Sequence, residues 1–124
     1  MNIAEAAKSC HLSIDTIRFY EKSGMLPKLD RDKRGWRSFD AGALEWLSIL
    51  ERLRATGMPL KDMRRFAQLV FTKDTKSIKA TRERLEILKR HQAVLLRRKA
   101  ELKTCEKYLN MKIEIYEDEL EKKS

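Results

Sequence analysis

The chain is 124 residues long, and its 28 Lys and Arg against 19 Asp and Glu give a formal net charge of +9. This length suits one modest globular domain, or a smaller domain with an appendage. The charge fits either a solvated basic surface or a surface that binds a polyanion, because basic side chains neutralise phosphates and release counterions. Cys10 and Cys105 form no CxxC pair, which argues against a thiol zinc site and suits a reducing compartment.

Sequence motifs for membrane insertion and catalysis are missing. No N-terminal apolar run resembles a signal peptide, and no stretch is long enough to span a bilayer, so we expect a cytoplasmic protein without membrane contact. The sequence has no glycine-rich phosphate loop, HExxH motif, nucleophile elbow or paired carboxylates beside a pocket-like motif. His11 and His91 are isolated, which is more typical of turn or surface residues. We therefore expect no enzyme activity, no metal and no cofactor.

The N-terminal residues predict two short helices separated by a turn. Residues 2–9 form the first helix, and residues 10–12 break it. Ser13 is a good N-cap for a second helix over residues 14–22, and Gly24 suits the position just past its end. This spacing is typical of a helix-turn-helix.

The second helix has side chains suited to reading DNA. Ile17 and Glu21 are predicted to face inward, with Arg18 at the border, while Thr16 and Tyr20 are predicted to face outward. Thr and Arg near the start of an exposed helix can contact base edges in a major groove, and Tyr can hold a phosphate. Taken alone, the segment fits an ordinary amphipathic helix with a solvated face equally well.

Residues 28–39 predict a small basic hairpin centred on Gly35. Its aromatic side chains, Trp36 and Phe39, can pack the hairpin or lie on a sugar-phosphate backbone. We expect the Phe39 side chain to pack in the core and the Arg37 side chain to contact phosphate. The basic residues of this segment are Lys28, Arg31, Lys33, Arg34 and Arg37.

Two further helices complete the predicted N-terminal domain. Asp40 is a plausible N-cap for the third helix, which ends at residues 56–57, and Pro59 suits the first turn of the fourth. Residues 72–76 are a polar break. The predicted organisation is a domain over 1–71, a linker over 72–76, and a C-terminal helix and tail over 77–124.

The C-terminal segment has a heptad pattern without Gly or Pro. Its leucines recur every seven residues, whereas the alternate core positions are mostly polar. So long a helix needs a partner for this apolar face, either the chain's other helices or a second copy, and we favour self-association. The predicted dimerisation residues are Leu88, Leu95, Leu102 and Leu109.

Three runs, LSIDTIRFYEKSGMLP, RGWRSFD and LERLRATGMPLKDM, together resemble the MerR family of transcription regulators. The resemblance is close over residues 1–70 and architectural beyond them. It implies a mainly α fold, in which a winged helix-turn-helix DNA-binding domain precedes a long antiparallel coiled-coil dimerisation helix. The implied wings are residues 28–39 and residues 57–61.

The resemblance also implies roles for individual residues. Thr16 and Arg18 would lie in the major groove, and Tyr20 would contact the backbone from the same helix. Arg37 and Lys61 would bind phosphate from the two wings. The predicted DNA-contacting residues are Thr16, Arg18, Tyr20, Arg34, Trp36, Arg37 and Lys61.

The chain departs from the family pattern at several positions. His11 stands where a glycine is usual in the helix-helix turn, and we expect the turn to be kept at some cost. The C-terminal run is similar to small members related to aldehyde- and stress-responsive regulators. Arg52 stands where some of these carry a sensing cysteine, and Cys105 is alone where metal sensors carry a pair.

The sequence thus predicts a sequence-specific transcription regulator that binds double-stranded promoter DNA as a homodimer. By resemblance it distorts the promoter in response to an unknown signal, beside RNA polymerase. Two alternatives fit the composition: an architectural DNA-binding protein without promoter specificity, and a helical protein-interaction adaptor whose basic charge only keeps it soluble.

Overall fold

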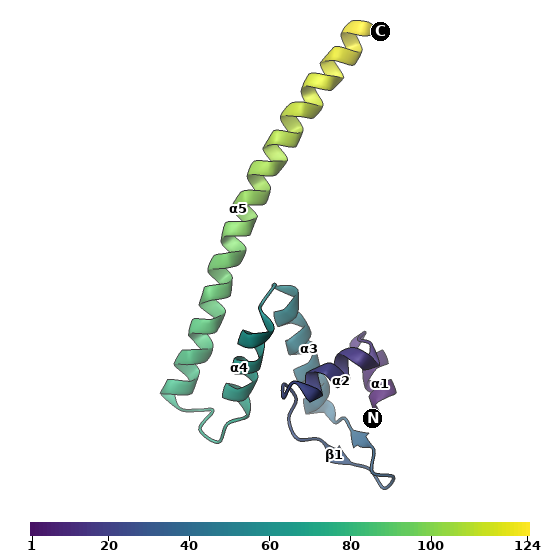
Figure 1. Ribbon diagram of the computed structural model, residues 1–124, viewed down its shortest axis with the longest axis vertical. Coiled ribbons are helices and arrows are strands. Elements are labelled where there is room, and N and C mark those ends of the chain that lie inside the picture. Colours follow the sequence, from purple (N-terminus) through teal and green to yellow (C-terminus); the bar gives the residue numbers. More distant parts are fainter. The chain divides into compact units, whose positions relative to one another are not determined.

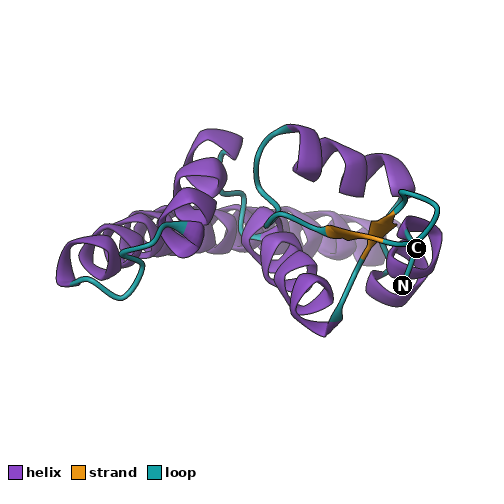
Figure 2. Cartoon of the chain, turned by 90° about the horizontal axis from the view of Figure 1, so that it is seen from below, coloured by secondary structure: helices purple, strands orange, loops and turns teal.

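The computed structural model describes residues 1–124 and is mainly helical, as predicted (Figure 1). The two strands form one antiparallel hairpin (Figure 2). The chain divides into two compact units, Met1–Leu88 and Lys89–Ser124. The elements in chain order are α1 (Ile3–Cys10), α2 (Ile14–Lys22), β1 (Asp30–Arg31), β2 (Arg37–Ser38), α3 (Ala41–Ala55), α4 (Leu60–Phe71) and α5 (Ile78–Lys123).

The helix starts follow from local capping chemistry. Asn2 and Glu5 form a capping box at α1, in which each side chain accepts a hydrogen bond from the other residue's backbone N–H. The predicted N-caps of α2 and α3 are confirmed, because Ser13 and Asp40 each accept a backbone N–H from the first turn of their helix. Pro59 is the N-cap of α4 rather than a residue of its first turn.

The turn between α1 and α2 keeps left-handed geometry without a glycine. His11 has φ 57° and ψ 39°, and its backbone N–H donates to the carbonyl oxygen of Ala7. A histidine adopts this conformation at a cost on the order of 1 kcal/mol. Gly24 has φ 76° just past α2, as predicted, where a residue without a Cβ carries no such cost.

One apolar core holds the first unit together. The fully buried side chains include Ile17 of α2 and Leu47 and Leu50 of α3. Trp46 is also buried, and its indole N–H donates to the carbonyl oxygen of Met25 at 2.6 Å. Burying a leucine or isoleucine side chain contributes roughly 1.5–3 kcal/mol. This core fixes α2 against α3, so the exposed face of α2 is held in a defined position.

The start of α5 belongs to this first unit. Ala80 and Ile87 are buried in the same core, so the unit extends to Leu88, past the predicted linker at 72–76. Arg84 closes that segment: its guanidinium donates to the carbonyl oxygens of Leu69 at 2.6 Å and Thr75 at 2.8 Å. The predicted linker is therefore a hydrogen-bonded turn between α4 and α5.

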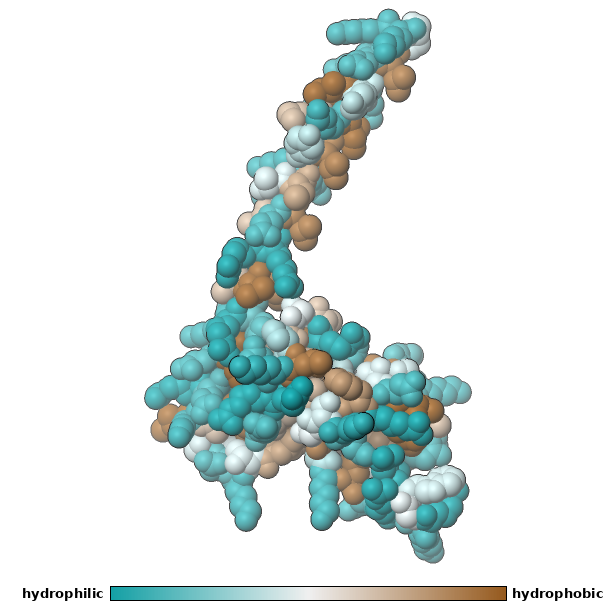
Figure 3. Space-filling view, in the orientation of Figure 1, coloured by the Kyte–Doolittle hydropathy of each residue, from teal (hydrophilic) through white to brown (hydrophobic).

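The second unit is the remainder of α5, and it exposes a row of apolar side chains. Leu95, Leu102 and Leu109 are 40%, 69% and 59% exposed. Apolar side chains recur along this helix among charged ones (Figure 3). No helix of the chain combines the length and the apolar character that crossing a bilayer requires.

Candidate DNA-binding surface

The face of α2 that packs inward differs from the prediction. Ile17 is fully buried, as predicted, but Tyr20 is only 1% exposed, so the prediction that Tyr20 faces outward is wrong. Glu21 is half-buried at the edge of the helix instead of facing inward. The phenol ring fills the core, and its hydroxyl donates to Glu51 Oε2 at 3.0 Å. Tyr20 therefore acts within the protein, and we remove it from the predicted DNA-contacting set.

Tyr20, Glu51 and Arg54 form one polar network at the end of α2. The Arg54 guanidinium donates to both carboxylate oxygens of Glu51, and Tyr20 donates to one of them. Burial, and then the bond to Glu51, raise the pKa of Tyr20 to about 12. The hydrogen bond from Arg54 lowers the pKa of Glu51, against the opposing effect of burial. The network thus holds Glu51 ionised between a neutral phenol and a guanidinium.

We expect Tyr20 to ionise at unusually high pH. The hydroxyl's contribution to stability is fully present below its ordinary pKa of 10.0 and is lost as the pH rises through about 12. A wild-type-minus-Tyr20→Phe difference in tyrosinate absorbance should therefore show one step near pH 12. Tyr108→Phe removes an exposed tyrosine, and the titration of this variant should still contain the step near pH 12. A difference step near pH 10 would show that the phenol is not held by Glu51.

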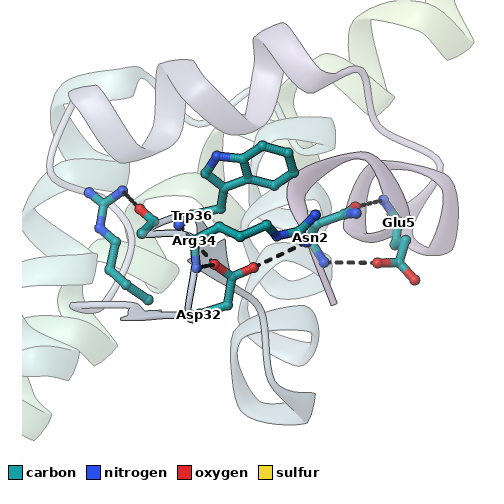
Figure 4. Close-up of polar contacts among 7 residues, drawn as sticks. Asn2, Glu5, Asp32, Arg34 and Trp36 are labelled. Atoms are coloured by element: carbon teal, nitrogen blue, oxygen red, sulfur yellow. Dashed lines mark hydrogen bonds and ion pairs between the residues drawn. The ribbon is translucent and has the colours of Figure 1, made fainter.

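The hairpin of β1 and β2 forms the first wing, and Asp32 organises its tip. The strands pair Asp30 with Ser38 and Arg31 with Arg37. Asp32 Oδ1 accepts the backbone N–H groups of Arg34 at 2.8 Å and Trp36 at 3.1 Å (Figure 4). The bond from Trp36 is the largest cause of the lowered pKa of Asp32. These bonds hold the turn, in which Gly35 has φ 78°.

The predicted wing-tip residues Arg34 and Trp36 are stacked and exposed. The Arg34 guanidinium carbon lies 4.0 Å from the centre of the Trp36 ring, which is the geometry of a cation–π contact. Trp36 is 54% exposed, whereas Phe39 is 2% exposed in the core, as expected. Figure 4 shows the Trp36 ring lying over the Arg34 side chain. The tip thus presents a cation and an indole together.

Arg37 links this wing to α2. Its Nε donates to Glu21 Oε1 at 2.5 Å, and both side chains are about one-third exposed. Beside this pair lies a hollow of about 300 Å³, in which the predicted residues Arg18, Trp36 and Arg37 meet. The hollow is lined by Asn2, Ile3, Arg18, Arg31, Trp36 and Arg37. Its cations and indole are suited to a sugar-phosphate strand.

A second hollow lies on the other flank of α2. It measures about 540 Å³, and two residues of the predicted set, Thr16 and Tyr20, line it. Lys61 is exposed in the first turn of α4 and lines neither hollow. Sequence reasoning missed Glu51 and Arg54, because only the fold brings these two residues of α3 to the edge of α2. The second hollow is lined by Asp15, Thr16, Phe19, Tyr20, Arg54, Met58 and Leu60.

This arrangement defines a class of protein: a winged helix-turn-helix, in which α2 is the second helix of the motif and the hairpin is the wing. Residues 1–69 match the family described as MerR HTH family regulatory protein. The chain belongs to the MerR family of transcriptional regulators.

Relatives cover most of the chain. An HTH-type transcriptional regulator of Haemophilus influenzae is 38% identical over 114 residues, 92% of this chain and 82% of the relative. AdhR of Bacillus subtilis is 30% identical over 80 residues, 64% of this chain and 56% of AdhR.

Solved structures share the fold over nearly the whole chain. HiNmlR, a MerR family regulator lacking the sensor domain and solved bound to promoter DNA, aligns with a TM-score of 0.77 at 36% identity, covering 94% of this chain and 90% of HiNmlR. A MerR family regulator from Bacillus thuringiensis aligns with a TM-score of 0.71 at 30% identity, covering 91% of this chain and 96% of the regulator.

Proposed function

We propose that this regulator binds promoter DNA sequence-specifically as a homodimer and distorts it in response to a signal. The observation that carries the proposal is the surface around α2. Arg18 is exposed and lines one hollow, Thr16 is half-buried and lines the other, and each hollow contains an arginine. A major groove admits an α-helix, and the strands that border the groove then lie on the two flanks of that helix.

The roles of the remaining predicted residues follow from their position on this surface. Arg18 reads base edges because it is exposed on α2, and Thr16 reads them from the first turn of the helix, where it is half-buried. Arg37 and the stacked pair Arg34 and Trp36 contact the sugar-phosphate backbone from the wing. Lys61 contacts phosphate on the opposite flank. HiNmlR, which was solved bound to promoter DNA, supports DNA as the ligand.

The exposed leucine row of α5 pairs two copies of the chain. Leu88, Leu95, Leu102 and Leu109 recur at heptad spacing, and a second copy offers a matching row. The family resemblance supports an antiparallel pair. A dimer carries two reading helices, so it binds two half-sites at once and gains avidity.

Distortion of the promoter follows from two DNA-binding domains, one in each subunit, that the dimer holds at a fixed separation. Bending a site of 20–30 base pairs costs on the order of 1–6 kcal/mol, which phosphate contacts from both subunits can offset. The signal then needs only to bind one geometry of the dimer more tightly than the other, because this difference in affinity shifts the dimer towards that geometry. Such a regulator works beside RNA polymerase at the promoter, and therefore in the bacterial cytoplasm.

Footprinting in cells tests this proposal. Dimethyl sulfate footprints of the target promoter should show the same protected bases in conditions where transcription is on and where it is off. The active state alone should add a hyperreactive step at the centre of the site. Protection that disappears when transcription begins would identify a simple repressor, and a missing footprint in both conditions would contradict promoter binding altogether.

A further inference from the structure

Two arginines flank α2, and a glutamate holds each of them. On the side of the first wing, Glu21 accepts the Nε of Arg37. On the other side, Glu51 accepts Nε of Arg54 at 3.1 Å and also an Nη2 bond. Glu51 is in turn held by the hydroxyl of Tyr20. Consecutive residues of α2, Tyr20 and Glu21, thus connect the helix to one arginine on each flank.

The hollow beside Arg54 has the chemistry of a sugar-phosphate strand. Phe19 is 43% exposed and Leu60 is 39% exposed, so they offer an apolar surface to deoxyribose. The Arg54 side chain is 57% exposed. A guanidinium has five N–H donors, and Glu51 takes those on one edge, so the other edge remains for a phosphate oxygen.

Asp15 lines the same hollow, and its negative charge disfavours binding of a free anion there. With the Glu51–Arg54 pair nearly neutral as a whole, the hollow has no excess positive charge to concentrate free phosphate. A phosphodiester of a strand that other contacts already hold does not need such an excess, because its position is set by the rest of the interface.

We propose that Arg54 binds a DNA backbone phosphate beside Thr16, and that Glu51 and Tyr20 are its positioning residues. This contact lies outside the set predicted from sequence, and it rests on the proposed DNA-binding function. It gives the buried hydroxyl of Tyr20 a role in DNA affinity without any contact between Tyr20 and DNA.

The salt dependence of binding tests the contact. Fluorescence anisotropy with a labelled duplex of unrelated sequence, and with a promoter fragment selected from genomic DNA, gives log K against log salt for each variant. Arg54→Ala should reduce the slope by about one unit per subunit on both duplexes and leave their affinity ratio unchanged. Arg65→Ala is the matched control, because Arg65 is half-exposed and paired with Glu83 away from α2.

A double-mutant cycle tests the positioning role. Tyr20→Phe keeps the buried ring and removes the bond to Glu51, so it should weaken DNA binding in the wild-type background. In the Arg54→Ala background it should have no further effect. A purely structural role for the hydroxyl predicts the same loss in both backgrounds, which would overturn the positioning role. Circular dichroism confirms that each variant is folded before it is titrated.

The outcomes separate this inference from the proposed function. If Arg54→Ala keeps the slope of the Arg65→Ala control while the wild type still prefers the promoter fragment, the Arg54 contact is overturned and the proposed function stands. If the wild type shows no preference but Arg54→Ala lowers the slope, the phosphate contact stands and sequence-specific regulation fails. Equal slopes together with no preference would overturn both.

Discussion

Replacing Leu95 and Leu102 together by glutamate should convert the protein to monomers and abolish operator binding. The seam of a dimer would then hold four carboxylates, two from each copy. An uncompensated buried charge costs roughly 3–5 kcal/mol, and a nanomolar dimer is held by only about 12 kcal/mol. The two leucines are already 40% and 69% exposed in the single chain, so the monomer should stay folded.

The loss of DNA binding follows from the loss of the second DNA-binding domain of the dimer. Binding of two linked sites can exceed the affinity of one by roughly 100- to 10,000-fold, and a monomer loses that gain. Sedimentation velocity gives the mass of the variant, and anisotropy gives its affinity. Arg97→Glu with Thr104→Glu is the matched control, because both residues are exposed on the helix face opposite the leucine row. A dimeric Leu95→Glu, Leu102→Glu variant would refute the leucine seam.

Arg18→Ala should reduce sequence preference more than it reduces general affinity for DNA. A bidentate contact between arginine and guanine is worth about 1–3 kcal/mol, which over two half-sites amounts to about 2–6 kcal/mol. The preference should relax at one position of each half-site, measured by binding to a panel of single-base operator variants. The matched comparison is Arg37→Ala, at the neighbouring arginine of the wing.

Arg18 and Arg37 line the same hollow, so their roles need to be separated. Arg37→Ala should weaken binding to every duplex and lower the salt slope by about one unit per phosphate contact. If Arg18→Ala behaves like Arg37→Ala, so that it lowers the salt slope and leaves the base preference intact, Arg18 contacts the backbone rather than a base. The base-reading role of α2 would then rest on Thr16.

Local sequence signals predicted most of the fold. The N-caps Ser13 and Asp40 and the glycine past α2 act within one helical turn, so the sequence shows them directly. The heptad row of α5 is likewise a repeat that can be read from spacing. The family resemblance marked His11 as standing where a glycine is usual, and its φ of 57° confirms that the turn keeps left-handed geometry.

The parts that sequence could not predict depend on tertiary contacts. Ile17 has neighbours on the same helix face at both three and four residues further on, so periodicity alone did not decide between Tyr20 and Glu21. The decision depends on Glu51, which accepts the Tyr20 hydroxyl from another helix, and on Arg37, which draws Glu21 to the edge. Arg54 had no sequence signal beyond an i,i+3 pair with Glu51, which is usually only a surface feature.

The ratio of specific to non-specific affinity tests the central claim most directly. Competition anisotropy at physiological salt compares a promoter fragment selected from genomic DNA with a scrambled duplex of the same length and composition. A sequence-specific dimeric regulator predicts a preference on the order of 1,000-fold or more for the selected fragment, lost when the leucine seam is disrupted. Equal affinity for both duplexes would contradict the account and identify a non-specific DNA-binding protein.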